Sequence, residues 1–103
     1  MNKMLNLLGL AQCAGKTISG ESFCLDAIRN KSAHVVFLAS DAGINTTKRI
    51  VDKATFYQVK VINYFTSSEL SKAIGKNNRM VIAICDSGFA KKIKEMGDLN
   101  GKS

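Results

Sequence analysis

The sequence predicts an α/β fold in which about four strands alternate with about five helices, and one small sheet carries helices on both sides. Residues 35–39 and 80–85 are apolar at consecutive positions. A strand of this kind, apolar at every position instead of every second one, is typical of a sheet covered on both faces by helices. The segments between the strands repeat apolar residues at helical spacing. Together, the two patterns predict this architecture.

The length and composition favour one domain. At 103 residues, 46% of them hydrophobic, the chain can bury a substantial core, so we expect a single domain over residues 1–103. Cys13, Cys24 and Cys85 lie far apart and form no CxxC pair, which is typical of a reducing compartment. No long apolar run follows the amino terminus, so we expect neither secretion nor membrane insertion and predict a cytoplasmic protein.

The chain is strongly basic. Fifteen Lys and Arg residues against eight Asp and Glu residues give a net charge of +7 and a pI of about 9.5. Such an excess on a small domain favours anionic partners such as nucleic acid. A positive surface can also serve solubility alone, and the charge by itself leaves that alternative open.

The first third of the chain predicts a helix, a short strand and a second helix. The first helix is indicated by the spacing of Met4, Leu7, Leu8 and Ala11, and Gly15 is a natural stop for it. Thr17 and Ile18 indicate the strand. Ser19 is the expected N-cap of the second helix, whose inward face is predicted to hold Phe23, Cys24, Ala27 and Ile28.

Gly20 has two interpretations. A helix start without a side chain lets another backbone, including that of a nucleic acid, approach exposed amide groups. A simple turn glycine is the alternative, and this residue alone favours the turn.

The central strand over residues 35–39 leads into a polar loop over residues 40–45. Ligands of open α/β sheets bind beyond the carboxyl ends of such strands, so Asp41 in this loop is a candidate binding residue. Asn45 is the expected N-cap of a third helix that buries Ile50, Val51 and Ala54.

The remaining elements are a strand, a helix, a strand and a final helix. Val59, Val61 and Ile62 indicate the first of these strands. Thr66 and Glu69 form a capping box that begins the short helix. A polar, basic loop over residues 75–79 leads into the strand over residues 80–85. The final helix begins near Asp86 and is predicted to bury Phe89, Ala90, Ile93 and Met96.

The sequence offers little for catalysis. It has no paired carboxylates in one element, no Ser/His/Asp or Cys/His set at a suggestive spacing and no metal-ligand cluster. The single histidine, His34, enters an apolar strand with no second ligand type beside it. We therefore predict neither an enzyme nor a cofactor. Loops rich in Gly, Asn, Ser, Lys and Arg remain, and these residue types recognise phosphates and base edges.

These segments resemble a known family. The chain resembles the ribosomal protein L7Ae/L30e family in four segments: residues 18–21, the strand over residues 33–42, the helix over residues 69–75 and the strand over residues 81–84. The likeness runs over nearly the whole chain and is greatest to the short bacterial, ribosome-associated members. It implies a three-layer α/β/α sandwich with a small mixed four-stranded sheet, and binding to RNA kink-turns or related internal loops.

The resemblance also implies where RNA would bind. In the family, the start of the second helix and the loop before the last strand lie side by side and hold the RNA. The corresponding residues here are Gly20, Glu21, Ser22, Phe23, Asp26, Lys76, Asn77, Asn78, Arg79 and Met80. We add Asp41 from the loop argument, and Lys16 and Lys31, which we expect to flank the same edge of the sheet.

The chain departs from the kink-turn binders of this family within these positions. Those binders carry Asn-Glu where this chain has Ser22 and Phe23, Lys where it has Asp26, and a small apolar loop in place of residues 76–79. A proline that is common in the family before the core of the third strand is replaced here by Lys60. The Asn-Glu pair reads sheared G·A pairs through hydrogen bonds, and a carboxylate at position 26 repels phosphate. We therefore expect the basic loop to shift affinity toward backbone contacts, with Arg79 gripping a phosphate or stacking on a base.

We predict a non-catalytic protein that binds structured RNA, is associated with the ribosome or translation, and is a monomer when free. Its partners would be ribosomal or other RNA and the ribosome or its proteins. One alternative is a protein-interaction module of the same fold, for which Phe23 and Asp26 are the best signs. Another is an enzyme acting on a nucleotide or phosphate compound at the Asp41 loop, but we identify no nucleophile or base in the sequence for such a reaction.

Overall fold

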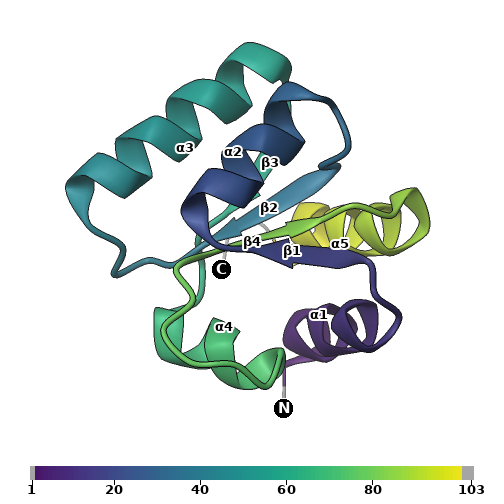
Figure 1. Cartoon of the computed structure of the whole chain (residues 1–103). Coiled ribbons are helices and arrows are strands. Elements are labelled where there is room, and N and C mark those ends of the chain that lie inside the picture. The colour runs from purple at the N-terminus through teal and green to yellow at the C-terminus, as the bar shows by residue number, and fades with distance from the viewer. Residues whose placement is uncertain (1, 101–103) are drawn as a thin grey trace.

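The protein is a three-layer α/β/α sandwich. The computed structural model describes the backbone of residues 2–100 and the side chains of residues 2–96. Over this part of the chain five helices and four strands follow one another in the predicted order (Figure 1). They are α1 (Lys3–Cys13), β1 (Thr17–Ser19), α2 (Glu21–Arg29), β2 (Val35–Leu38), α3 (Ile44–Tyr57), β3 (Lys60–Ile62), α4 (Ser67–Ala73), β4 (Val81–Ile84) and α5 (Ser87–Asn100).

The four strands form one mixed sheet in the order β1-β4-β2-β3. β4 is antiparallel to both of its neighbours, β1 and β2, whereas β2 and β3 are parallel. Every residue of β2 and β4 is buried. The small sheet covered on both faces, predicted from the apolar segments, is therefore confirmed, and so is the mixed sheet that the family resemblance implies.

Two cores lie on opposite faces of the sheet. α2 and α3 cover one face, and α1, α4 and α5 cover the other (Figure 1). Alternate strand residues divide between the cores, because successive side chains of a strand point to opposite faces. Val36 and Leu38 pack with α2 and α3, whereas Val35 and Phe37 pack with the other three helices.

Two of the predicted N-caps are wrong by one or two residues. Ser19 ends β1, where it pairs with Ile82, so Gly20 becomes the N-cap of α2. Asn45 lies inside α3, which Gly43 caps in an extended conformation. The capping box of α4 is confirmed: the Thr66 hydroxyl accepts the backbone N–H of Glu69, and the Glu69 carboxylate accepts that of Thr66.

Two residues predicted to face inward are exposed instead. Phe23 is 67% exposed, and Val51 also faces solvent. Their helices bury Cys24, Ala27 and Ile28 in α2 and Ile50 and Ala54 in α3. Each exposed residue is the immediate neighbour of a buried one, and a step of one residue turns the side chain by about 100° away from the buried stripe.

No helix in the described part of the chain is long and apolar enough to cross a bilayer.

Candidate nucleic-acid interface

Gly20 places the start of α2 beside the beginning of β4. Because β1 and β4 are antiparallel, the end of β1 lies next to the beginning of β4. The Gly20 N–H donates a hydrogen bond to the Val81 carbonyl oxygen at 3.0 Å. Gly20 has φ 103° and ψ 144°, a conformation that residues with a Cβ rarely adopt. The glycine is therefore required where the chain leaves the sheet and enters α2.

The loop over residues 76–80 is exposed at its tip and anchored at its base. Lys76, Asn77 and Asn78 are exposed, and Asn78 is left-handed with φ 57°. Ser71 of α4, which is buried, forms the anchor. Its hydroxyl oxygen accepts the backbone N–H of Arg79 at 2.8 Å, and its carbonyl oxygen accepts that of Lys76 at 2.9 Å. A helix thus holds the basic loop against the core at two points.

Arg79 has a buried guanidinium nitrogen that lacks an acceptor. The side chain is half-buried, and within the described residues its Nε has no hydrogen-bond partner. Leaving such a donor unpaired costs about 1–3 kcal/mol. A ligand oxygen that draws the guanidinium toward itself would relieve this cost.

The other residues that the family resemblance assigns to RNA lie at or near this edge. Ser22, Phe23 and Asp26 are all exposed along α2, and Met80 is 37% exposed just before β4. An exposed aromatic ring offers a surface on which a base can stack. The structure therefore places the start of α2 beside the beginning of β4, at the end of this loop, whereas Lys76, Asn77 and Asn78 lie against α4.

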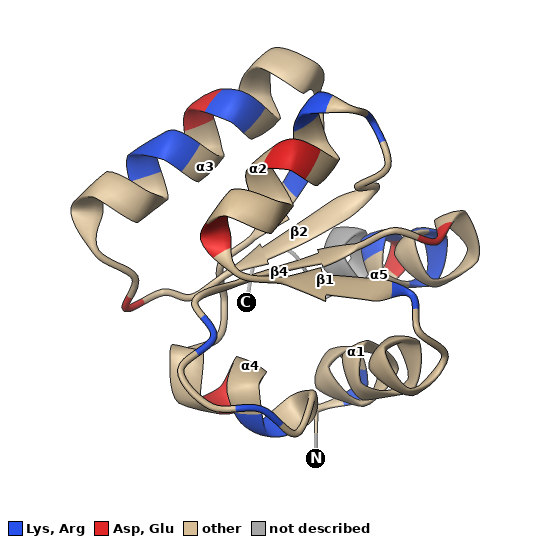
Figure 2. Ribbon diagram, in the orientation of Figure 1, with Lys and Arg blue, Asp and Glu red and all other residues tan. Residues whose placement is uncertain are grey.

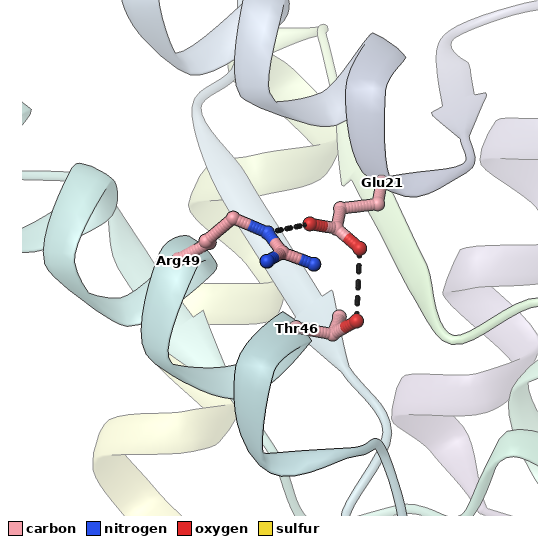
Figure 3. A network of polar contacts seen from close by, with 3 residues as sticks. All are labelled: Glu21, Thr46 and Arg49. Atoms are coloured by element: carbon pink, nitrogen blue, oxygen red, sulfur yellow. Dashed lines mark hydrogen bonds and ion pairs between the residues drawn. The ribbon is translucent and has the colours of Figure 1, made fainter.

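Glu21 bridges α2 and α3. Its carboxylate accepts a hydrogen bond from the Arg49 Nε, with which it also forms an ion pair, and another from the Thr46 hydroxyl at 2.8 Å (Figure 3). The bond from Arg49, followed by that from Thr46, holds the pKa of Glu21 below its ordinary value. Glu21 is therefore occupied within the protein, and its contribution at this edge is to fix the start of α2 relative to α3.

Asp41 is likewise tied to a neighbouring helix. The Ser67 backbone N–H and hydroxyl donate to its two carboxylate oxygens at 2.8 and 2.9 Å. These hydrogen bonds, that of the backbone first, lower the pKa of Asp41. Asp41 lies after β2, whose end pairs with the beginning of β4. Asp41 therefore lies at the same end of the strands as Gly20, and its carboxylate is hydrogen-bonded to the first turn of α4.

Lys16 and Lys31 do not flank that edge, which corrects our expectation. The Lys16 carbonyl oxygen accepts the N–H of Cys85, at the end of β4, and Lys31 follows the last turn of α2. Both residues are exposed at the opposite end of the sheet from Gly20. The antiparallel register of β1 and β4 explains the separation, because the start of β1 meets the end of β4.

A polar hollow beside the loop had no signal in the sequence. It has a volume of about 350 Å³ and is lined by Ser67, Ser68, Ser71, Lys72, Lys76, Asn77 and Asn78. Its serines belong to α4, and its amides belong to the loop. Only the folding of the loop back onto α4 brings them together, so single-sequence patterns could not indicate this group.

Cationic side chains occur over several parts of the surface. Figure 2 shows Lys and Arg on α2, on α3, on α5 and along the segment between α4 and β4. Among the side chains of residues 2–96, no three His, Cys, Asp or Glu residues gather into a set that could hold a metal ion. The edge at Gly20 thus offers cations, amides and hydroxyls as its recognition groups.

This combination defines a small basic α/β/α domain in which the start of α2 lies beside the beginning of β4 and a basic loop, held by α4, leads into that strand. The chain belongs to the ribosomal protein L7Ae/L30e/S12e/Gadd45 family, whose sequence model matches residues 2–94.

Two relatives are similar over most of their length. The RNA-binding protein YlxQ of Enterococcus faecium is 47% identical over 94 residues, which cover 91% of this chain and 90% of that protein. The RNA-binding protein YlxQ of Bacillus subtilis (strain 168) is 41% identical over 92 residues, covering 89% and 92%.

Two solved structures are similar to the fold. A protein with unknown function from Bacillus halodurans C has a TM-score of 0.91 and 40% identity, covering 95% of this chain and 99% of that one. The Giardia lamblia 15.5kD RNA binding protein has a TM-score of 0.77 and 16% identity, covering 92% and 84%. At that identity the second likeness concerns the fold alone.

Proposed function

We propose that this chain is a non-catalytic RNA-binding protein that recognises structured, kink-turn-like RNA and is associated with the ribosome or translation. Its family membership and the two similar proteins named as RNA-binding support this function. We further propose that residues 1–103 act as one cytoplasmic domain, that the free protein is a monomer, and that binding needs no cofactor.

One observation carries the proposal. The start of α2, opened by Gly20, lies directly against the beginning of β4, where the Gly20 N–H donates a hydrogen bond to the Val81 carbonyl oxygen. Exposed amide groups at a helix start attract phosphate, and the loop that leads into β4 carries the exposed Lys76, Asn77 and Asn78 beside α4. The two parts together form a surface suited to a folded nucleic-acid backbone.

The groups at this surface favour contacts to phosphates over reading of G·A edges. Where the kink-turn binders of the family have an Asn amide and a Glu carboxylate that read base edges, this chain has the Ser22 hydroxyl and the Phe23 ring. Arg79 brings a guanidinium nitrogen without an acceptor in the described protein. A guanidinium can bind phosphate through two parallel hydrogen bonds, so we assign Arg79 the main phosphate contact.

A titration tests this function. The protein is titrated against a kink-turn RNA, and against the same RNA with its G·A pairs replaced, at two salt concentrations. The Lys76→Ala/Arg79→Ala double variant is compared with Lys91→Ala/Lys92→Ala near the start of α5, which removes the same charge from the opposite end of β4. We expect the first pair alone to lower the salt slope by about 1.5, since each phosphate contact contributes about 0.7–0.9.

Two results would contradict the proposal. One is an absence of binding to either RNA at low salt. The other is an equal loss in the two double variants, because net charge and not the surface at Gly20 would then account for the affinity.

A protein-interaction module is the second candidate, and exposed Phe23 favours it. At 67% exposure beside the exposed Asp26, the ring offers a patch that a protein partner could cover. Co-purification of a protein that survives nuclease treatment and depends on Phe23 would support this candidate over RNA.

A further inference from the structure

A second surface lies between α2 and α3, away from the edge at Gly20. The two helices run side by side over one face of the sheet (Figure 1). A groove with a volume of about 550 Å³ opens between them, lined among others by Arg29, Arg49, Asp52, Lys53, Phe56 and Tyr57. Cations and aromatic rings thus lie together in one groove.

The aromatic part of the groove is open to solvent. Phe56 is 77% exposed, although it is a large apolar side chain. Its ring packs edge-on against that of Tyr57, with 4.9 Å between ring centroids. The edge contact holds the Phe56 ring while leaving it accessible, as a base-stacking platform requires.

Three cations line the groove against the single carboxylate of Asp52. Arg29 pairs with Asp26 at 3.4 Å, and Arg49 is held by Glu21. Within residues 2–96, Lys53 has no ion-pair partner. Lys53 therefore provides a positive charge close to Phe56, one turn away on the same helix.

The groove begins at the proposed RNA edge. Both helices start at the end of the sheet where Gly20 lies, because α2 follows Gly20 and α3 follows the loop containing Asp41. The bridge between Glu21 and Arg49 marks this end (Figure 3). From Arg49 to Phe56 the helix rises about 10 Å, the length of about three stacked nucleotides.

We propose that this groove binds a single-stranded segment of RNA that continues from the structured RNA at the edge. One base stacks on Phe56, and Lys53 contacts a phosphate. The inference rests on the proposed function, because the edge would deliver the strand to the groove. Continuity with that edge, and a flat exposed ring beside an unpaired cation, favour RNA over an acidic peptide.

The test compares tailed and tail-less RNA. A kink-turn RNA is prepared with and without a tail of about six uridines at either end, a length within the range of single-stranded binding sites. In the wild-type protein we expect one of the tails to strengthen binding at least about fivefold, as stacking of one base would. The tail should also steepen the salt dependence.

Substitutions in the groove should remove only the benefit of the tail. Phe56→Leu and Phe56→Ala should abolish the gain without changing the affinity for tail-less RNA, whereas Phe56→Tyr keeps the ring and should retain it. Lys53→Ala should lower the salt slope of tailed RNA by about 0.7. Leu10→Ala and Lys92→Ala, exposed positions on α1 and α5 in the other layer, are the matched controls and should keep the full gain.

The outcomes separate the two proposals. If tail-less RNA binds but neither tail adds affinity, or if Phe56→Leu and Phe56→Ala keep the gain, the groove does not bind RNA and the inference is wrong. A protein partner in the groove would give this same result. If wild-type protein binds neither RNA, the proposed function fails, and the inference fails with it.

Discussion

The conformation of Gly20 can be tested by making one substitution at two helix starts. Gly20 and Gly43 are the N-caps of α2 and α3, and neither has a side chain to cap its helix. Gly20 has φ 103°, whereas Gly43 has φ −61° and ψ 157°. Serine is a good N-cap in the extended conformation of Gly43 but not in that of Gly20. Replacement by serine should therefore change stability in opposite directions.

The magnitudes follow from the backbone at each position. A Cβ at Gly20 would lie 3.7 Å from the Phe23 ring, an ordinary contact, so the cost comes from the backbone. We expect Gly20→Ser to lower the free energy of unfolding by about 1–3 kcal/mol. A Cβ at Gly43 would meet no atom within 4 Å. Gly43→Ser should raise that free energy by about 0.5–1 kcal/mol, through the new cap and a less flexible unfolded chain.

Urea unfolding followed by far-ultraviolet circular dichroism measures both variants against wild type. The midpoints should move apart while the slopes stay equal, since neither substitution changes the surface exposed on unfolding. Equal midpoints, or a Gly20→Ser variant more stable than Gly43→Ser, would refute the argument that backbone conformation requires glycine at this edge.

Three further predictions concern contacts elsewhere in the fold. The Arg49 contact lowers the native pKa of Glu21, so the stability that this contact adds is complete above the ordinary pKa of 4.5 and is lost as the pH falls through the native pKa. In urea unfolding, the free energy of unfolding should therefore fall less for Glu21→Gln than for wild type as the pH is lowered from about 5 to about 3. Thr66→Ala should lower the free energy of unfolding by about 0.5–2 kcal/mol in the same assay, through loss of the capping box, while Ser68→Ala on the exposed side of α4 should change little. Burial raises the pKa of Cys24 to about 12, so a thiol reagent should modify exposed Cys13 in the native protein and reach Cys24 only on unfolding; equal rates at Cys13 and Cys24 would contradict this burial.

Local and strongly patterned features of the fold could be predicted from the sequence. The capping box at Thr66 depends on two residues three positions apart, and the buried strands β2 and β4 depend on unbroken apolar runs. The predicted N-caps Ser19 and Asn45 were wrong. Ser19 pairs with Ile82 in the sheet, so Gly20 caps α2, and the extended backbone of Gly43 makes that residue the N-cap of α3. Such decisions depend on the sheet and not on the local sequence.

The candidate site could be predicted only in part. The family resemblance placed Gly20 next to the loop over residues 76–80, which no local pattern indicates. The partnership of Glu21 with Arg49 joins residues 28 positions apart, and that of Asp41 with Ser67 joins residues 26 apart. A single sequence shows that charges are present but not which end of a strand they occupy, so Lys31 was assigned to the wrong edge.

The outer strands of the sheet bear on how copies of this protein behave when crowded. β1 and β3 form the two edges and are only three residues long, and Lys60 is exposed at the start of β3. Free edges expose unpaired backbone groups that can recruit a second chain, and short strands bearing lysine limit such recruitment. The short outer strands and Lys60 therefore leave neighbouring copies of the protein little exposed backbone through which to pair into aggregates.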